Sequence, residues 1–106
     1  MSWFYLLTAS LFEIVWAVSL KTSDGFSRPV ASLVTISAMI ASFWFLALAM
    51  RVLPLGTAYA IWTGLGAVGA FTFGILFLGE TLALERLIAI ALIVSGLVLL
   101  KVSAMV

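Results

Sequence analysis

The sequence predicts an all-α integral membrane protein, with four transmembrane helices in a single domain covering residues 1–106. Two observations carry this prediction. Apolar residues make up 66% of the chain and charged residues only 8%, whereas soluble domains carry about 25% charged residues. The apolar residues also fall into four stretches of roughly 20 residues, which is the length that crosses a bilayer as a helix.

A polar turn separates the first two predicted helices. The first helix, at about 3–21, carries one charged residue, Glu13, before it ends at Lys21. The polar turn that follows closes at Pro29. Because proline is favoured at the first position of a helix, Pro29 marks the start of the second helix, at about 30–50.

The last two predicted helices are bounded in the same way. A connection that contains Arg51 and Pro54 precedes the third helix, at about 55–78. The polar segment 79–86 precedes the fourth helix, at about 85–102. Eight of the nine charged residues of the chain lie in these connections, at helix ends or near the C-terminus. The charge inside the first helix is therefore an exception to the pattern.

That exception, Glu13, predicts a proton or cation site within the membrane. A carboxylate at the bilayer centre costs roughly 2.5–3.5 kcal/mol on insertion scales, and acids at such positions commonly serve ion or proton pathways. Trp16 follows three residues later, on the same helical face. Its indole N–H can donate to the acid, or its ring can lie against a cation. The alternative for Trp16 is a packing or interfacial role.

Polar and aromatic residues on the third helix form one stripe. Tyr59, Trp62, Thr63 and Gly66 share a helical face, and aromatic rings in such a stripe can stack on a planar or quaternary cation. On this helix alone, ordinary core packing explains the stripe better. Gly64 and Gly66 also weaken the helix, which indicates either a bend point between two transport states or a close-packing site.

The second helix offers a further polar group, Ser42. A serine in a membrane helix usually bonds the backbone of its own helix, and this remains the alternative to a role in the site. We expect two neighbours of Ser42 to line the site as well. They are Met39, about one turn earlier, and Phe43, the next residue. Ser10, one turn before Glu13 on the first helix, is placed there as well.

The distribution of basic residues predicts insertion in both orientations. The positive-inside rule counts Lys and Arg near helix ends. Three such residues lie on one side, and two lie on the other side together with the N-terminal amine. The alternative is a weak orientation bias. The basic residues on the first side are Lys21, Arg28 and Arg86, and those on the second are Arg51 and Lys101.

Insertion both ways predicts an antiparallel homodimer. One chain of four short helices is too thin to enclose a hydrated site and to keep Glu13 away from lipid. Two opposed copies would surround one central space, as inverted repeats do in larger transporters. Small residues allow close helix contact in lipid, so Ala89, Ser95 and Gly96 on the fourth helix mark the expected dimer contact. Packing within one chain is the alternative.

Composition also excludes several classes of function. The chain has no cysteine, so it forms no disulfide or thiolate metal site. It has no histidine, which is the commonest metal ligand and the usual base near neutral pH. The net charge of +1 gives no field that would attract nucleic acid. We therefore expect no metal, no cofactor, no nucleic-acid partner and no enzymatic activity.

Three motifs of the chain resemble the small multidrug resistance family, and the similarity covers essentially the whole length. A glutamate followed by a tryptophan three residues later is typical of the guanidinium-exporting subtype. The drug-exporting subtype has a small residue where Trp16 stands. The motifs are FEIVWA at residues 12–17, GFSR at residues 25–28 and LPLGTAYAIWTGLG at residues 53–66.

The resemblance implies an antiparallel, dual-topology homodimer in the bacterial inner membrane that exchanges protons for guanidinium-like cations. It implies that Glu13 binds proton and substrate in turn. It further implies that Trp16 and Ser42 donate hydrogen bonds to that carboxylate. Tyr59 and Trp62 would line the same site.

The resemblance also implies that Gly64 and Gly66 flex between two states. Two features depart from the family pattern. Ser10 stands where the family usually has glycine, which narrows the site or adds a hydroxyl group. The segment 42–44 is more similar to the drug exporters. Transport of hydrophobically substituted guanidinium ions or of quaternary ammonium ions is therefore kept as an alternative.

Three alternatives therefore accompany the guanidinium exporter. One is a broad exporter of quaternary ammonium and other lipophilic cations. Another is a proton-carrying subunit of a rotor ring, which needs one membrane carboxylate but no aromatic site around it. The last is a structural helical subunit, which leaves the cost of the membrane carboxylate unexplained.

Overall fold

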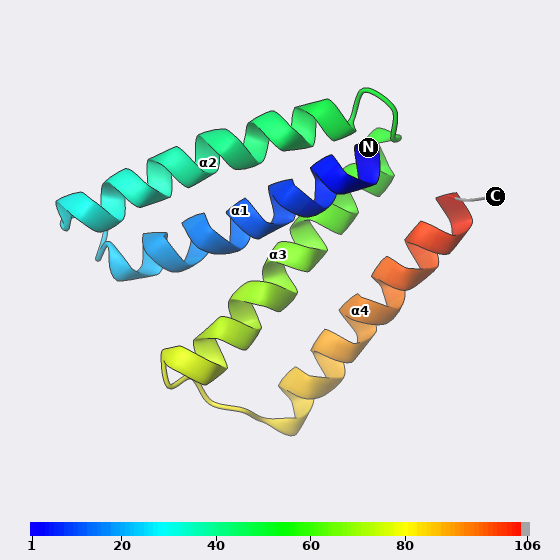
Figure 1. Cartoon of the computed structure of the whole chain (residues 1–106). Helices are drawn as coiled ribbons and strands as arrows, with labels where there is room; N and C mark the ends of the chain where they lie inside the picture. The colour runs from blue at the N-terminus through cyan, green and yellow to red at the C-terminus, as the bar shows by residue number, and fades with distance from the viewer. Residues whose placement is uncertain (105–106) are drawn as a thin grey trace.

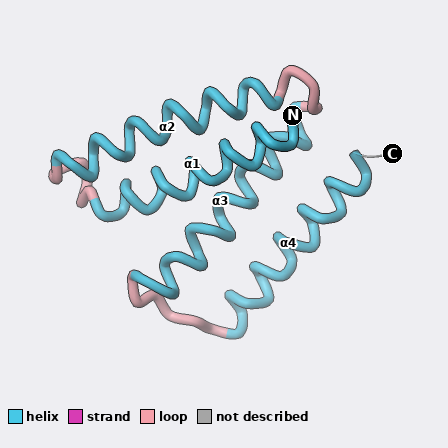
Figure 2. The backbone as a smooth tube through the Cα atoms, in the orientation of Figure 1, coloured by secondary structure: helices cyan, strands magenta, loops and turns pink. Residues whose placement is uncertain are grey.

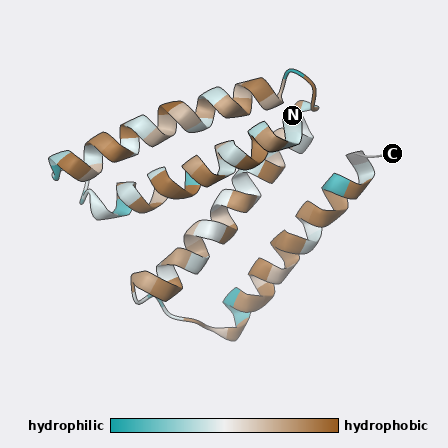
Figure 3. Ribbon diagram, in the orientation of Figure 1, coloured by the Kyte–Doolittle hydropathy of each residue, from teal (hydrophilic) through white to brown (hydrophobic). Residues whose placement is uncertain are grey.

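The computed structural model describes residues 1–104 and consists of four α-helices joined by short connections. Each helix is long and apolar enough to cross a membrane, and hydrophobic residues, brown in Figure 3, recur along all four of them. The helices begin and end within two residues of the predicted ranges, so the prediction of four membrane helices is confirmed. Residues 105 and 106 of the predicted domain lie outside the described part. The helices are α1 (Ser2–Thr22), α2 (Pro29–Ala49), α3 (Leu55–Phe77) and α4 (Leu84–Ala104).

The turn between α1 and α2 is tight and held by one buried serine. Pro29 occupies the start of α2, as its position in the sequence predicts. Residues 24–26 have φ angles of 52°, 69° and 66° in succession, a left-handed conformation that is unfavourable for residues other than glycine. The Ser23 hydroxyl donates to the Leu20 carbonyl over 2.7 Å and accepts the Phe26 N–H over 3.1 Å, which stabilises the turn.

The four helices form a thin slab. α1 runs antiparallel along α2 and crosses α3, whereas the backbone of α4 packs only against α3 (Figures 1 and 2). The Cα atoms extend over 45 × 35 × 16 Å. The N-terminus and the end of α4 lie at the same end of the slab (Figure 1). One chain is therefore as thin as the sequence predicts.

The core lies where α1, α2 and α3 meet. Alanines contribute to it from all three helices, and small residues let helix backbones approach closely in a membrane. The described residues of α4 contribute no buried side chain to it. The buried members of the core are Leu6, Ala9, Leu46, Ala49, Ala58, Ile61 and Trp62.

The crossing of α1 and α3 depends on two glycines. The Glu13 carboxyl group occupies the space that a Cβ atom on Gly66 would need. The Ile14 side chain fills the same space at Gly69. A larger residue at either position of α3 would have to displace the Glu13 or the Ile14 side chain.

α4 has one face on α3 and one face without contacts inside the chain. Gly96 has no heavy atom within 4 Å of the position of a Cβ atom, and Ala89 and Ser95 are exposed. Packing within the chain, the alternative for these small residues, therefore does not account for them. The half-buried face toward α3 consists of Ile90, Ile93, Leu97 and Leu100.

We predict that Gly69→Val destabilises the protein by about 1–3 kcal/mol, because the new side chain occupies the space of the Ile14 side chain and forces it out of its packing against α3. Unfolding of the purified protein in mixed micelles of detergent and increasing SDS measures this free energy. Gly56→Val is the matched control, because no heavy atom lies within 4 Å of a Cβ atom there. Equal destabilisation by both variants would contradict the assigned contact.

Candidate functional site

Glu13 lies in the middle of α1, half-buried against Gly66 of α3. Its Oε1 atom is buried and has no hydrogen-bond partner among residues 1–104. Leaving a buried acceptor without a donor costs about 1–3 kcal/mol, and more for a charged group. This oxygen is therefore suited to accept a proton or the N–H group of a cation.

Trp16 carries a second polar atom of the same kind. Its Nε1 is buried and lacks an acceptor within the described chain. The hydrogen bond from Trp16 to Glu13 that the family resemblance implies is thus not formed in this structure. A lone acceptor and a lone donor consequently lie three residues apart on α1.

Ser42 makes two hydrogen bonds, and neither is to Glu13. Its hydroxyl donates to the Ala9 carbonyl over 2.7 Å and accepts the Trp62 indole N–H over 2.9 Å. A bond to its own helix, the alternative from the sequence, is therefore wrong. The implied bond to the Glu13 carboxylate is also absent, because a serine hydroxyl has only one proton and Ala9 receives it.

These bonds nevertheless reach the backbone that carries Glu13. In an α-helix the carbonyl of residue i−4 accepts the N–H of residue i, so the Ala9 carbonyl also belongs to the turn that holds Glu13. Trp62 on α3 and Ser42 on α2 are thereby joined to this turn of α1. The hydroxyl positions the helix rather than the carboxyl group.

An aromatic row connects the three core helices. The rings of Trp16 and Phe43 have centroids 6.5 Å apart, and those of Phe43 and Trp62 are 5.8 Å apart. Tyr59 continues the row, 5.7 Å from Trp62. These separations are typical of interacting aromatic pairs. The structure therefore brings together four of the aromatic residues that the sequence places at the site.

The predicted stripe on α3 divides into two parts. Trp62 is 7% exposed and Gly66 is buried, so both face α1 and α2. Tyr59 is 54% exposed and Thr63 is exposed too, so the ring of Tyr59 meets Trp62 from the rim. The core-packing alternative thus fits the inner part of the stripe only.

Ser10 and Met39 differ in how they relate to the site. Ser10 is fully buried, and its hydroxyl donates to the Leu6 carbonyl of its own helix over 2.9 Å. It adds volume one turn before Glu13 but offers no free donor there. Met39 is half-buried on α2, one turn before the residues that contact Trp16 and Trp62.

Both glycines of the proposed hinge are close-packing sites in this structure. Gly66 accommodates Glu13, and Gly64 accommodates the Leu97 side chain of α4. The helix continues through both without a break, from Leu55 to Phe77. Of the two interpretations that the sequence leaves open, close packing explains what is seen here.

Some contributors carry no clear signal in the sequence. The acceptor of the Ser42 bond is the backbone carbonyl of Ala9, and a carbonyl is present at every position. Gly69 could have been identified from the sequence as a helix-contact residue, because it lies three residues after Gly66 on the same face of the helix. The rings of Phe12 and Phe45 stack with their centres 6.0 Å apart. This contact could not be predicted from the sequence, because it depends on the register of α1 against α2.

Comparisons with known proteins cover nearly the whole chain. A family model described as Small Multidrug Resistance protein matches residues 1–93. A Salmonella typhimurium protein named "Guanidinium exporter" is 57% identical over 104 residues, which cover 98% of this chain and 99% of that protein. Proteins with the same name from Citrobacter freundii and Proteus vulgaris are 55% and 54% identical. Their alignments cover 97% and 98% of this chain, and 98% and 100% of those proteins.

We predict that Ser42→Ala destabilises the protein by about 1–3 kcal/mol, because it removes the link to Ala9 and leaves the buried indole N–H of Trp62 without an acceptor. Unfolding in SDS measures the change, and ultraviolet resonance Raman spectra report the lost indole hydrogen bond. Ser32→Ala is the control, since that exposed hydroxyl bonds only its own helix. An unchanged indole signal in Ser42→Ala would show that the bond is not formed.

Proposed function

We propose, because this chain belongs to the Small Multidrug Resistance family, that it exports guanidinium and related small guanidinyl cations in exchange for protons. It is a multi-pass membrane protein with four membrane-spanning helices. We place it in the bacterial inner membrane, in keeping with its enterobacterial relatives. The names of those relatives support the substrate class.

The observation that carries this proposal is the buried, unpartnered Oε1 of Glu13. A guanidinium ion is planar and presents paired N–H donors that match the two oxygens of a carboxylate. It also stacks on aromatic faces and is weakly hydrated compared with an ammonium ion. A half-buried carboxylate with Trp16 on the same face therefore fits such a cation.

Competition at Glu13 would couple the two fluxes. A bare carboxylate is unfavourable where it is partly removed from water, unless a proton neutralises it or a cation pairs with it. Proton and guanidinium need the same oxygen atoms, so one must leave before the other binds. Each exchange at Glu13 then moves the two species in opposite directions.

The surrounding side chains take distinct roles in this proposal. Trp16 and Tyr59 supply ring faces and polar atoms at the edge of the site. Trp62 supplies a third ring, which its 2.9 Å bond to Ser42 holds in place. Phe43 lies between the two indoles. Ser42 thus acts as a positioning residue in the site.

We also propose that two chains form the working unit, as an antiparallel homodimer. The 16 Å slab leaves Glu13 only half-buried in one chain. The face of α4 that holds Ala89 and Gly96 has no contacts within the chain. In the proposed dimer a second copy contacts this face of α4 and also covers the side of Glu13 that one chain leaves exposed. In such a dimer, Gly64 and Gly66 are the places where α3 would bend between states.

The main rival is an exporter of quaternary ammonium ions. The aromatic row through Phe43 is an apolar surface next to the site. Such a surface can bind the hydrophobic groups of a quaternary ammonium ion, and this favours the rival. A rotor-ring subunit and a structural subunit gain no support from membership of a family of exporters. Substrate comparison therefore decides between two transport activities.

We predict that Glu13→Gln abolishes proton-coupled guanidinium transport, because an amide can neither release a proton nor pair with a cation as a carboxylate does. Currents from proteoliposomes on a solid-supported membrane, after a step to guanidinium, measure the loss. Glu85→Gln is the control, since that exposed carboxylate lies in the first turn of α4, and it should keep wild-type currents.

The same recording separates the substrate classes. Wild-type protein should respond to guanidinium and give little current with tetraethylammonium at equal concentration. Equal responses to both would favour the broad exporter. Proton-driven guanidinium transport by the Glu13→Gln variant would refute the role of this carboxylate.

We predict that the chain inserts in both orientations in roughly equal amounts, because the basic residues nearly balance across the membrane. The protein contains no cysteine, so Ser27→Cys, in the exposed first turn, provides a unique thiol. A membrane-impermeant maleimide applied to intact cells should label about half of the molecules that it labels after lysis. Labelling of all or none in intact cells would contradict dual topology.

An internal control comes from charge removal. Arg28→Gln combined with Arg86→Gln takes two basic residues from one side of the membrane. The positive-inside rule then favours a single orientation with that side outward. Labelling of the Ser27→Cys thiol in intact cells should rise toward completeness in this background.

A further inference from the structure

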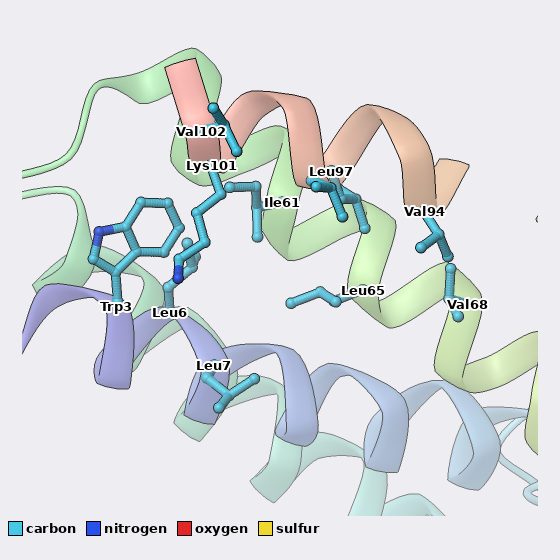
Figure 4. A pocket seen from close by; sticks show the side chains of 11 residues that line it. Trp3, Leu6, Leu7, Ile61, Leu65, Val68, Val94, Leu97, Lys101 and Val102 are labelled. Carbon is cyan, nitrogen blue, oxygen red and sulfur yellow. The ribbon is translucent and has the colours of Figure 1, made fainter. Parts of the chain in front are cut away.

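A cavity lies between α1, α3 and α4, and Glu13 does not line it. Its volume is ≈ 490 Å³, within the usual range for pockets that bind small ligands. Figure 4 shows its side chains converging from the three helices. None of the residues assigned above to the transport site lines it. This groove is therefore a separate feature of the molecule.

The groove has an apolar wall and one charged residue. Among the described residues that line it, Lys101 carries the only charged side chain, and the others are aliphatic or tryptophan. The Nζ atom of Lys101 lies 5.5 Å from the centre of the Trp3 ring, and the two side chains face each other in Figure 4. The groove continues from this pair past Leu65 and Val68 toward Val94.

The charged end of the groove lies at the membrane surface. Trp3 is in the first turn of α1, and Lys101 is in the last turn of α4. Both ends belong to the same side of the slab (Figure 1). Tryptophan and lysine are enriched at the level of lipid headgroups, where the lysine ammonium extends to the polar layer. The apolar part of the groove therefore points into the hydrocarbon layer.

We infer that this groove binds one acyl chain of an anionic phospholipid, with the lipid phosphate paired to Lys101. The apolar wall suits the hydrocarbon chain, which is as apolar as the leucines and valines around it. The lone cation at the mouth is complementary to a phosphate. From Lys101 to Val94 the groove spans roughly 10 Å along α4 at 1.5 Å per residue, which accommodates part of an acyl chain.

A helix of a second copy is a poorer fit for the same space. The small residues that favour helix association, Ala89 and Gly96, do not line the groove. The surface of α4 suited to another helix and the surface suited to lipid are therefore different.

The charge at the mouth sets the expected preference. A basic side chain near a membrane surface contributes about 1 kcal/mol of attraction to anionic lipid, which corresponds to roughly a fivefold difference in affinity. Wild-type protein should therefore retain phosphatidylglycerol about fivefold better than phosphatidylcholine with the same acyl chains. Native mass spectrometry of the purified protein with each lipid counts the retained molecules.

Two pairs of variants test the assignment. Lys101→Gln should lose the preference for phosphatidylglycerol, whereas Arg51→Gln, a change in an exposed basic residue at the same end of the slab, should keep it. Val98→Trp fills the groove and should reduce retention of both lipids. Leu55→Trp, at a position that is 70% exposed and outside the groove, should reduce neither.

Three results would overturn the inference. One is an unchanged lipid preference in Lys101→Gln. Another is an equal loss in Arg51→Gln, which would reflect general surface attraction. The third uses Val98→Cys carrying a photoreactive maleimide in a phosphatidylglycerol bilayer: cross-linking to a second protein chain rather than to lipid would assign the groove to the dimer. Cross-linking of the Val98→Cys probe to phosphatidylglycerol, together with reduced lipid retention by the separate Val98→Trp variant, would support the lipid site.

Discussion

The contact between the Glu13 carboxyl group and the backbone of α3 at Gly66 is the constraint on which the site depends. Because Gly66 has no side chain, α1 and α3 cross closely enough to bury one oxygen of the Glu13 carboxyl group away from water and lipid. Ile14 against Gly69 extends this close approach by one turn. A larger residue at Gly66 would displace the Glu13 carboxyl group from this position, and one at Gly69 would displace the Ile14 side chain.

The crossing is fixed from the other side by α2. Ser42 joins the indole of Trp62 to the Ala9 carbonyl, so all three core helices meet through polar groups one turn from Glu13. The structure therefore holds the acid by its backbone and leaves its oxygen unpaired. In the proposed exchange, this arrangement keeps the carboxylate available to proton and cation while its position stays the same. The backbone of α4 packs only on α3, which leaves much of its surface for other partners.

Much of this organisation is predictable from the sequence, because it follows from hydropathy and helical spacing. The four helices, the placement of Glu13 and the aromatic residues near it all come from such local patterns. The hydrogen bonds of Ser42 were not predictable, since they depend on the rotation of α2 against α1 and on a backbone acceptor at Ala9. The separation of α4 from α1, and thus the groove at Lys101, is set by a crossing angle that no local pattern encodes.

The central claim is that proton and guanidinium compete for the Glu13 carboxylate. Proton release from purified protein in a weakly buffered detergent solution near neutral pH, recorded while guanidinium is added, measures this competition without any transport step. The proposed exchange predicts that protons leave in proportion to the guanidinium bound, and that the release saturates with binding. Saturable guanidinium binding by the wild-type protein with no proton release at any pH from acidic to alkaline would contradict it.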